Sequence, residues 1–593
     1  MPPTSSVSPT EMAAPPGGSF LIASVTPDQV FTPEDFDEDQ EQVRRTTLRF
    51  MSEEVLTQVA DLEKKQPGLA RQLIEQAAEL GLLGVLVPER YDGLEMNLAT
   101  QALVSECLGS YASFSTTYGA HAGIGTLPIV FFGTERQKQA YLPRLGSAEL
   151  MAAYCLSEPQ AGSDALAALT RAELSPDGRH YVLNGQKMWI SNGDWADLYT
   201  VFAKVDGEKF TAFLVEREWK GVSPGAEEHK MGLWGSSTTA LYLDNVHVPV
   251  ENVLGEIGRG HLIAFNVLNL GRLELAASCV GGNKHLIAES AAYAAQRKAF
   301  GTTISNFGAI RQKIADMTVR TFAGESLIYR TAGMIDARLA GFSWDEPDAA
   351  ATALRAVEEY AIECSISKVY LSEAHDFVAD EAVQIHGGYG YHQDYAVERC
   401  YRDSRINRIF EGTNEINRLL TAGMLLKRAS QGRLDLLTAI LNAQQIPEPV
   451  ADSDSFARYR DLAERTKRAT LIAAGAAYQR FGQDLERHQQ VTAALGDMVM
   501  GGYALESALL RAMKLRPGGR AASTADILAV LSQETMTRIR ELGCLVLGSC
   551  LEGAELEHGF DAFEILTRTV PENLPAAKQR IASRVFEAGG YAL

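Results

Sequence analysis

The spacing of hydrophobic residues changes twice along this 593-residue chain, and the change limits which folds the chain can adopt. Apolar residues recur at helical spacing from about residue 35 to 150, and they alternate with a period of two between about 155 and 265. Helical spacing returns near Leu262 and continues to about Arg428, with a polar interruption at 341–348. A period near 3.6 is typical of helices and a period of two is typical of half-buried strands. The sequence therefore predicts a mainly α fold with a central antiparallel β-domain.

These changes, together with the proline and glycine content between them, predict five parts. They are a flexible N-terminal tail (1–34), an N-terminal helical domain (35–154), a middle β-domain (155–265), a helical bundle (266–440) and a C-terminal helical domain (441–593). Pro447 and Pro449 predict a linker into the last part. Within that part, helical spacing predicts long helices at about 454–486, 489–515, 523–550 and 574–588.

Size and charge are those of a large enzyme and argue against one class of ligand. With 593 residues, of which 46% are hydrophobic, the chain can bury more than one core. Its formal net charge is −20 and its pI is near 5.1, whereas nucleic-acid binding needs a basic surface. We therefore expect no nucleic-acid partner, and a polyanionic ligand must be bound by local cations or helix N-termini.

Cysteine spacing and the N-terminal residues bear on the compartment. The seven cysteines form no C-x-x-C pair and show no metal-ligand spacing, so we expect reduced thiols and no metal site. Residues 1 to 43 contain no Lys or Arg, which argues against a signal or transit peptide in the chain as given. No apolar run reaches the ~18 residues of a spanning helix. We expect a cytoplasmic protein of bacterial type, and we interpret His386 as a packing residue.

The C-terminal part repeats part of the helical bundle at one offset. Adding 181 gives eight identities, which are Phe300/Phe481, Gly301/Gly482, Asp316/Asp497, Met317/Met498, Ala323/Ala504, Glu325/Glu506, Ser326/Ser507 and Arg330/Arg511. A shared offset indicates duplicated helices, although Ala-rich helices also match by chance. The counterpart of Arg297 is Tyr478, and the second copy has no E-G-T segment. We expect the second copy to cover a surface instead of catalysing.

One carboxylate, Glu411, has neighbours that favour proton abstraction. It follows the apolar pair Ile409 and Phe410 and precedes Gly412 and Thr413. Apolar surroundings raise the pKa of a glutamate toward neutral, and a following glycine lets a substrate approach the backbone. For an isolated E-G-T segment the alternative is a helix-start glutamate stabilised by the helix dipole. The surrounding sequence decides in favour of a base.

Four further segments accompany Glu411. They are YCLSEPQAGSD at 154–164, NGQKMWISNG at 184–193, RKAFG at 297–301 and QIHGGYG at 384–390. In this order, over residues 35 to 425, the five segments resemble the acyl-CoA dehydrogenase family. Gly119-Ala120-His121, Phe307-Gly308 and the helical extension after residue 440 are most similar to the very-long-chain type.

The resemblance implies an FAD-dependent oxidoreductase that converts acyl-CoA, of long chain length, to trans-2-enoyl-CoA in fatty-acid β-oxidation. That reaction needs a base for the α-proton, an acceptor for the β-hydride and donors to the thioester oxygen. By resemblance Glu411 is the base. The resemblance implies FAD contacts for Tyr154, Leu156, Ser157, Gly162, Ser163, Trp189, Ile190, Ser191, Arg297, Phe300, Gln384, Gly387, Gly388, Thr413, Asn414 and Glu415. It implies substrate contacts for Ser163, Asn269, Arg272, Gly412, Gly119 and Gly123.

A second position for the base exists in one sub-branch of the family, and it corresponds to Gly271. Because this residue is a glycine, Glu411 has no rival from that source. Glu274 lies three residues further on, about 300° around a helix. We interpret Glu274 as a solvated or paired helix residue.

Partners and chain length are further expectations from the resemblance. Arg297 and Phe300 would reach the FAD of a neighbouring subunit, which implies a homodimer whose C-terminal domain covers a second contact surface and offers a place for peripheral membrane contact. Electrons would pass to an electron-transferring flavoprotein, and the alternatives are an oxidase using O2 and a non-enzymatic scaffold of the same fold. The small residues Gly119, Ala120 and Gly123 either deepen the acyl pocket for C12 to C18 chains or serve close helix packing.

Overall fold

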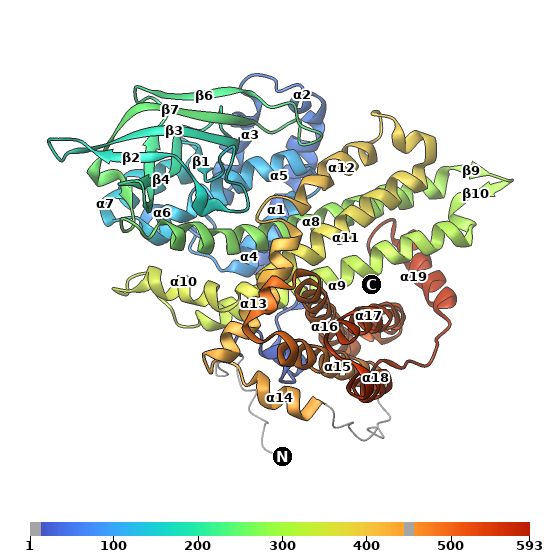
Figure 1. Cartoon of the computed structure of the whole chain (residues 1–593). Coiled ribbons are helices and arrows are strands. Elements are labelled where there is room, and N and C mark those ends of the chain that lie inside the picture. Colours follow the sequence, from blue (N-terminus) through green and yellow to red (C-terminus); the bar gives the residue numbers. More distant parts are fainter. Residues whose placement is uncertain (1–13, 444–455) are drawn as a thin grey trace, which may run out of the picture.

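The computed structural model describes residues 14–443 and 456–593, and the predicted linker prolines Pro447 and Pro449 lie outside the described residues. Figure 1 shows the β-domain and the N-terminal helices at one end of the molecule and the C-terminal helices at the other. Long helices of the middle bundle pass below the β-domain and extend toward β9 and β10 (298–303), beside the C-terminal helices. The predicted fold class, mainly α with a central β-domain, is confirmed.

The N-terminal helical domain begins at a capped helix, α1 (Glu38–Phe50). Asp37 accepts a hydrogen bond from the backbone N–H of Gln40 at 2.8 Å, and the Gln40 side chain accepts one from the backbone N–H of Asp37 at 3.2 Å. This reciprocal pair satisfies two amides that the helix leaves free. The other helices of the domain are α2 (Val59–Glu63), α3 (Leu69–Glu79), α4 (Leu98–Leu108), α5 (Ala112–Tyr118), α6 (Leu127–Phe132) and α7 (Glu135–Gly146).

The prediction of a flexible tail over residues 1–34 is wrong for its described part. Phe20 is buried, with its ring centroid 4.5 Å from that of Tyr503. Glu363 accepts a hydrogen bond from the backbone N–H of Gly18 at 2.7 Å. The composition of this segment argues for disorder because it offers few apolar residues to one another. Its partners lie hundreds of residues away in the chain, so the local sequence does not predict these contacts.

The middle domain is an eight-stranded sheet with the order β6-β7-β3-β2-β4-β5-β8, and β1 pairs with β4. Its strands are β1 (Ala152–Cys155), β2 (Arg171–Leu174), β3 (His180–Ser191), β4 (Leu198–Val205), β5 (Lys209–Glu216), β6 (Val222–Glu227), β7 (Thr238–Pro249) and β8 (Val253–Leu254). The prediction of an antiparallel sheet is wrong at β4, which pairs in parallel with both β1 and β2. Alternation along a strand shows which face is buried but not the direction of its neighbour.

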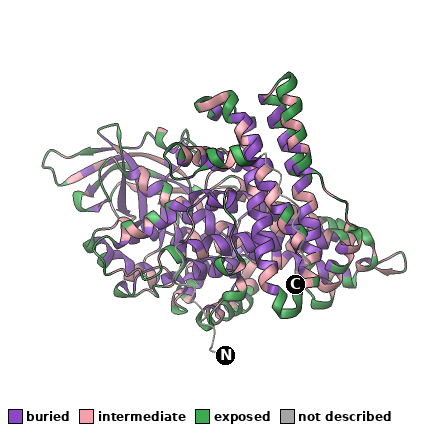
Figure 2. Ribbon diagram, turned by 90° about the horizontal axis from the view of Figure 1, so that it is seen from below, coloured by how far each residue is buried: buried purple, intermediate pink, exposed green. Residues whose placement is uncertain are grey.

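Two long helices form the centre of the helical bundle, α8 (Gly260–Gln296) and α11 (Ala361–His386), which pack along each other. Figure 2 shows buried residues concentrated along the central helices. The bundle also contains β9 (Lys298–Ala299), β10 (Thr302–Thr303), α9 (Gly308–Arg338), α10 (Ala349–Glu359), α12 (Ala396–Ser404) and α13 (Asn414–Ser430). Of the described helices, only α8 is long and apolar enough to cross a membrane, and 72% of its most apolar window is buried, as in a core helix.

The C-terminal domain has one helix more than predicted. Its described helices, with the short helix that precedes them, are α14 (Leu436–Ala443), α15 (Ala457–Phe481), α16 (Gln489–Leu515), α17 (Ala521–Cys550), α18 (Gly553–Thr567) and α19 (Leu574–Ala588). The missed helix is α18, whose Gly553 and Gly559 weigh against a helix by propensity. Packing outweighs propensity here, because Phe563 of α18 packs closely on Gly543 of α17. A Cβ on Gly543 would lie 1.9 Å from the Phe563 ring.

The internal repeat is visible in the contacts between α9 and α16. Arg330 on α9 lies 2.8 Å from Glu506 and 4.6 Å from the ring centroid of Tyr503. Its counterpart Arg511 on α16 lies 2.5 Å from Glu325 and 4.8 Å from the ring centroid of Phe322. Since 322 and 325 become 503 and 506 at the repeat offset, each arginine contacts equivalent positions of the other copy. Such exchange is the property of a two-fold symmetric interface, here formed within one chain.

Candidate functional site

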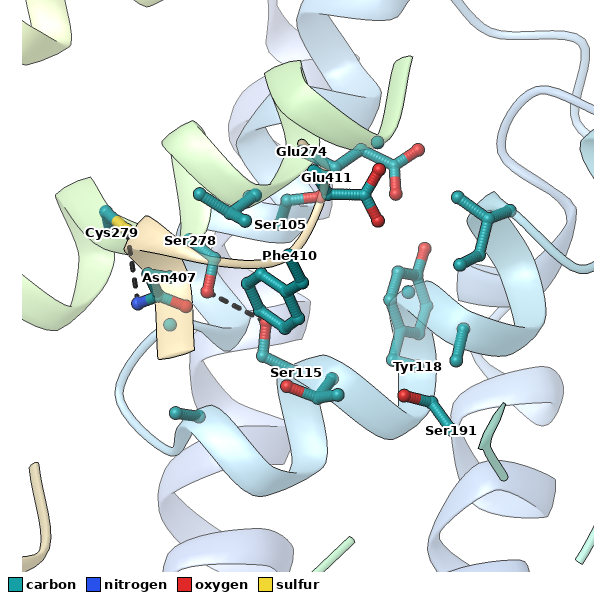
Figure 3. A pocket seen from close by; sticks show the side chains of 18 of the residues that line it. Ser105, Ser115, Tyr118, Ser191, Glu274, Ser278, Cys279, Asn407, Phe410 and Glu411 are labelled. Atoms are coloured by element: carbon teal, nitrogen blue, oxygen red, sulfur yellow. Dashed lines mark hydrogen bonds between the residues drawn. The ribbon is translucent and has the colours of Figure 1, made fainter. Parts of the chain in front are cut away.

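Glu411 lies in a pocket between α4, α5, α8 and the segment that precedes α13 (Figure 3). Glu411 and the following Gly412 have φ of +58° and +81°, so the chain turns sharply just before α13 begins. A glutamate with positive φ costs free energy, and it persists only where its surroundings fix it. The local backbone of this segment is therefore held in place by other parts of the bundle.

Buried polar side chains hold this turn. Arg272 donates from Nε to the backbone carbonyl of Glu411 at 3.0 Å and from Nη1 to Asn269 at 2.8 Å. Asn417 and Lys368 each donate to the carbonyl of Gly412 at 2.8 Å. The predicted substrate residues Arg272 and Asn269 thus lie behind the turn, where they position Glu411.

The Glu411 carboxyl group is held in a state that favours accepting a proton. Burial raises its pKa to about 7, and the opposing charges of Arg272 and Lys368 offset only part of that rise. Its Oε2 is buried and has no hydrogen-bond partner among the described residues. A Cβ on Gly271 would lie 2.9 Å from this oxygen, so the glycine provides the room that the carboxyl group occupies.

Lys368 also contributes to the site, and no motif in the sequence marks it. It is buried on α11 and also donates to Asn414 Oδ1 at 2.7 Å. Burial lowers the pKa of its ammonium group to about 8, and Glu411 acts in the opposite direction. The available signal was a lone lysine in the otherwise uncharged stretch 364–372. A lysine there must find buried partners, because an unpaired buried charge is strongly unfavourable.

The interpretation of Glu274 as a solvated or paired residue is wrong. Glu274 is buried and lines the same pocket, beside Glu411 (Figure 3). Its Oε1 is buried and has no hydrogen-bond partner among the described residues. The error lies in how the helical rotation was interpreted, because three residues turn the side chain through most of a full circle and bring it back near its starting direction. Residues i and i+3 share a face, so Glu274 follows Gly271 toward the pocket.

The residues expected to surround a flavin ring lie where β1 and β3 end. Ser191 lines the pocket of Glu411, and Trp189 is 59% exposed with a φ of +58°. Tyr154, Leu156 and Ile190 have buried side chains, so a ligand meets them only at the backbone or at an edge. Other residues of this predicted set are in exposed or half-buried loop positions, namely Ser157, Gly162 and Ser163.

The three residues at the start of α13 differ in their contacts. Thr413 caps the helix, since its Oγ1 accepts a hydrogen bond from the backbone N–H of Ile416 at 3.3 Å. The buried side chain of Asn414 bonds to Lys368 and Ser372. Glu415 is exposed. Of these three predicted cofactor residues, Glu415 therefore has the side chain most open to a ligand.

A second group lies at the far end of α8. Arg297, Gly387 and Gly388 line one cavity with His386, which packs its ring 4.1 Å from that of Tyr293. Phe300 is 96% exposed with a φ of +51°, and Gln384 is exposed as well. A Cβ on either glycine would meet nothing within 4 Å. From Gly271 to Arg297 the helix advances about 39 Å at about 1.5 Å per residue, so this group is remote from Glu411 in the same chain.

Comparison with known proteins identifies the family. Successive parts of the chain match the acyl-CoA dehydrogenase N-terminal domain (37–149), middle domain (153–246) and C-terminal domain (258–426), and residues 465–562 match a further acyl-CoA dehydrogenase C-terminal domain. A "Probable acyl-CoA dehydrogenase" of Bacillus subtilis is 45% identical over 583 residues, covering 97% of this chain and 98% of the relative. The chain belongs to the acyl-CoA dehydrogenase family.

Two further relatives support the identification. The very long-chain specific acyl-CoA dehydrogenase of rat mitochondria is 43% identical over 354 residues, which is 58% of this chain and 51% of the relative. The crystal structure of an acyl-CoA dehydrogenase complexed with FAD from Bacillus anthracis has a TM-score of 0.96 and 43% identity, covering 98% of this chain and 100% of that one. The predictions of family, of oxidoreductase class and of FAD as the family's cofactor are confirmed.

The residues of this acyl-CoA dehydrogenase fit an FAD molecule. Phe300 offers a bare aromatic face, Arg297 offers a cation, and Gly387 and Gly388 leave space for close backbone approach. At the other site, Ser191 lines the pocket of Glu411, and Trp189, two residues earlier on the same strand, is exposed. Because one chain separates these two groups by the length of α8, they fit two different FAD molecules.

Proposed function

We propose that this protein is an FAD-dependent dehydrogenase of long-chain acyl-CoA thioesters that acts in fatty-acid β-oxidation and passes electrons to an electron-transferring flavoprotein. The observation that carries the proposal is the Glu411 carboxyl group, which faces a pocket beside Ser191 and whose buried Oε2 lacks a partner within the described residues. The name of the rat relative, which specifies very long chains, supports the chain length.

In this mechanism the chain's own residues remove the proton and hold the thioester. The Glu411 carboxylate accepts the α-proton and becomes a neutral acid, a change made easy by a pKa near 7. Arg272 fixes the backbone of Glu411, whose N–H donates to the thioester oxygen as enolate charge develops. Lys368 holds Gly412 from the opposite side. When bound, FAD supplies the two-electron acceptor for the β-hydride.

Assembly follows from the separation of the two cofactor groups. We propose a homodimer in which Arg297 and Phe300 of one subunit complete the FAD site beside Ser191 and Trp189 of the other. The 96% exposure of Phe300 supports this arrangement, because an aromatic side chain that bare is typical of a binding surface. Within this proposal the dimer is cytoplasmic, and any contact with a membrane surface is made by the C-terminal domain.

The electron acceptor is the part of the proposal that one assay decides. The purified holoenzyme is mixed with dodecanoyl-CoA in air, and the reduction of an electron-transferring flavoprotein is measured together with the formation of hydrogen peroxide. We expect flavoprotein reduction to account for nearly all of the enoyl-CoA formed. Peroxide in equal amount to enoyl-CoA would make the protein an oxidase, and absence of enoyl-CoA would leave only the scaffold alternative.

The rate of flavin bleaching by acyl-CoA should rise with pH through about 7. Glu411 accepts a proton only as the carboxylate, and burial raises its pKa to about 7 from a usual value of 4.5. Below this pH the group is neutral and cannot act as a base, so the rate should fall about tenfold per pH unit on the acid side. Single-turnover bleaching from pH 5.5 to 8 measures this acid side of the pH–rate profile. A fall in rate with an apparent pKa near 4.5 would assign the proton transfer to a solvated carboxylate instead.

Chain-length preference should respond to Gly119. This residue lines the pocket, and a Cβ there would meet only Glu274 Oε2, at 3.8 Å. A glutamine at this position would therefore extend into the pocket without backbone strain. We expect the wild type to work best on C12 to C18 acyl-CoA, since each buried CH2 contributes about 0.8 kcal/mol. Gly119→Gln should move the optimum of kcat/KM to shorter chains, and a wild-type optimum at C4 to C8 would contradict the proposed length.

A further inference from the structure

The carboxyl group of Glu274 occupies space that two glycines of one short helical segment, Gly119–Gly123, leave open. A Cβ on Gly123 would lie 2.4 Å from Glu274 Oε2, and one on Gly119 would lie 3.8 Å from it. The arrangement matches that of Glu411, whose Oε2 lies 2.9 Å from the Cβ position of Gly271. The small residues beside this pocket therefore make room for two carboxyl groups. Both groups point into the same cavity (Figure 3).

Among the described residues, Glu274 has no ion-pair partner that explains its burial. Gln101 gives the carboxyl group a side-chain hydrogen bond, and the two titratable groups that face it, Glu411 and Tyr118, are not cations. The Tyr118 hydroxyl donates instead to the backbone carbonyl of Leu82 at 2.6 Å. Burial, and after it the charge of Glu411, raises the pKa of Glu274 to about 8. At neutral pH the group is thus a carboxylic acid, which can donate a hydrogen bond as well as accept one.

The wall that surrounds Glu274 is mixed, with polar residues interspersed among apolar ones such as Ala120, Ile124 and Leu275. The pocket follows one stripe of α8 from Gly271 past Glu274 to Ser278, and Ser278 lies 2.9 Å from Ser115 on α5, hydroxyl to hydroxyl. Other polar residues on the wall are Ser105, Thr116 and Asn407. An unsubstituted alkyl chain that excluded water from Glu274 would leave its buried oxygen without a partner, which is unfavourable. A chain that carries an oxygen of its own satisfies the group.

The position of that oxygen follows from the helix geometry. Glu411 marks the reacting α-carbon, C2, and it lies at the level of Gly271. Three residues along α8, from Gly271 to Glu274, advance about 4.5 Å, which equals roughly three to four bonds of an extended acyl chain. An oxygen on C5 or C6 therefore comes to the level of the Glu274 carboxyl group.

We propose, on the basis of the proposed function, that Glu274 is a specificity-determining residue that hydrogen-bonds an oxygen on the acyl chain. The preferred substrates are then acyl-CoA thioesters with a keto or hydroxyl group at C5 or C6. The reaction at C2 and C3 is unchanged, and Glu411 still removes the proton. Glu274 selects the substrate through contact with a part of the chain that does not react. Sites built to hydrogen-bond a substrate oxygen discriminate against analogues that lack it.

The test compares two probes on three forms of the FAD-loaded enzyme. The probes are dodecanoyl-CoA and 6-oxododecanoyl-CoA, and the forms are wild type, Glu274→Gln and Glu274→Leu. We expect the wild type to favour the oxo probe in kcat/KM by about three- to tenfold, the range of one net hydrogen bond. The glutamine amide still donates, so Glu274→Gln should keep the preference. Glu274→Leu should lose the preference and bind dodecanoyl-CoA more tightly.

The readouts separate this inference from the proposed function. Retained FAD absorbance in each variant shows that the site has folded. An unchanged preference in Glu274→Leu, or a wild type that favours dodecanoyl-CoA, overturns the role of Glu274 while the dehydrogenase remains. An equal loss of bleaching with both probes in Glu274→Gln would make Glu274 part of the proton transfer and also overturn the inference. Failure of the wild type to bleach with either probe overturns the proposed function itself.

Discussion

Replacing Glu411 with glutamine should leave a yellow, FAD-loaded protein whose flavin is no longer bleached by acyl-CoA. The amide has the size of the carboxyl group but cannot accept the α-proton, and losing a positioned base lowers a rate by at least ~10²–10⁴. The turn that carries the residue should persist, because Arg272 and Asn417 bind its backbone and not its side chain. Single-turnover bleaching with a C12 acyl-CoA measures the loss.

The same variant makes a second, independent measurement available. In the unfolded chain Glu411 titrates near 4.5, and in the folded protein burial raises its pKa to about 7. Between these values the folded state holds one more proton than the unfolded state, so stability falls as the pH rises through that window. The neutral glutamine does not titrate. We expect Glu411→Gln to melt at a higher temperature than the wild type at pH 8, and the gain should disappear near pH 4.

A matched control is Glu256→Gln, which changes a 79%-exposed glutamate that lies outside the pocket. It should alter neither bleaching nor melting, because an exposed ion pair contributes little. If Glu411→Gln keeps more than about a tenth of the wild-type bleaching rate, the base is another group. Glu274, the second carboxyl group in the pocket, would then be the first candidate.

The parts of the site that the sequence predicted are those with a local cause. Glu411 was predictable as a base candidate because an apolar pair precedes it and a glycine follows it within a short stretch of sequence. Lys368 and Glu274 were not, because their importance depends on which helix faces which. For Glu274, the rotation of about 300° from Gly271 places the side chain near the face from which it started, because three residues almost complete a helical turn.

The fold shows the same division between local and distant causes. Helix positions followed from periodicity, including the break between α9 and α10. The packing of Phe20 on Tyr503, the parallel neighbours of β4 and the helix α18 did not follow. Each of these depends on a partner that is remote in sequence, or on a contact close enough to outweigh propensity. The internal duplication is the exception, because a repeat carries long-range information in the sequence itself.

That repeat leads to the largest effect on stability that we expect. Arg511→Ala should lower the free energy of unfolding by about 3–5 kcal/mol, because it leaves the buried Glu325 without one of its cations. Arg330→Ala should have a similar effect through Glu506, since the two arginines occupy equivalent positions in the two copies. Each glutamate keeps one lysine partner, Lys284 for Glu325 and Lys467 for Glu506. The losses of unfolding free energy should therefore lie toward the lower end of this range.

Denaturant midpoints of the two variants, measured beside a surface control, test the symmetry. Arg487→Ala removes an 83%-exposed arginine of the same domain and should change the midpoint little. The double variant Glu325→Leu with Arg511→Leu should recover part of the loss, because Lys284 keeps Glu106 as a partner although Glu34 loses Arg511. A large loss of stability for one arginine variant and none for the other would show that the two exchanged contacts contribute unequally to the free energy of unfolding. Equal losses mean that the duplicated helices hold each other as two subunits of a symmetric dimer do, although both copies belong to one chain.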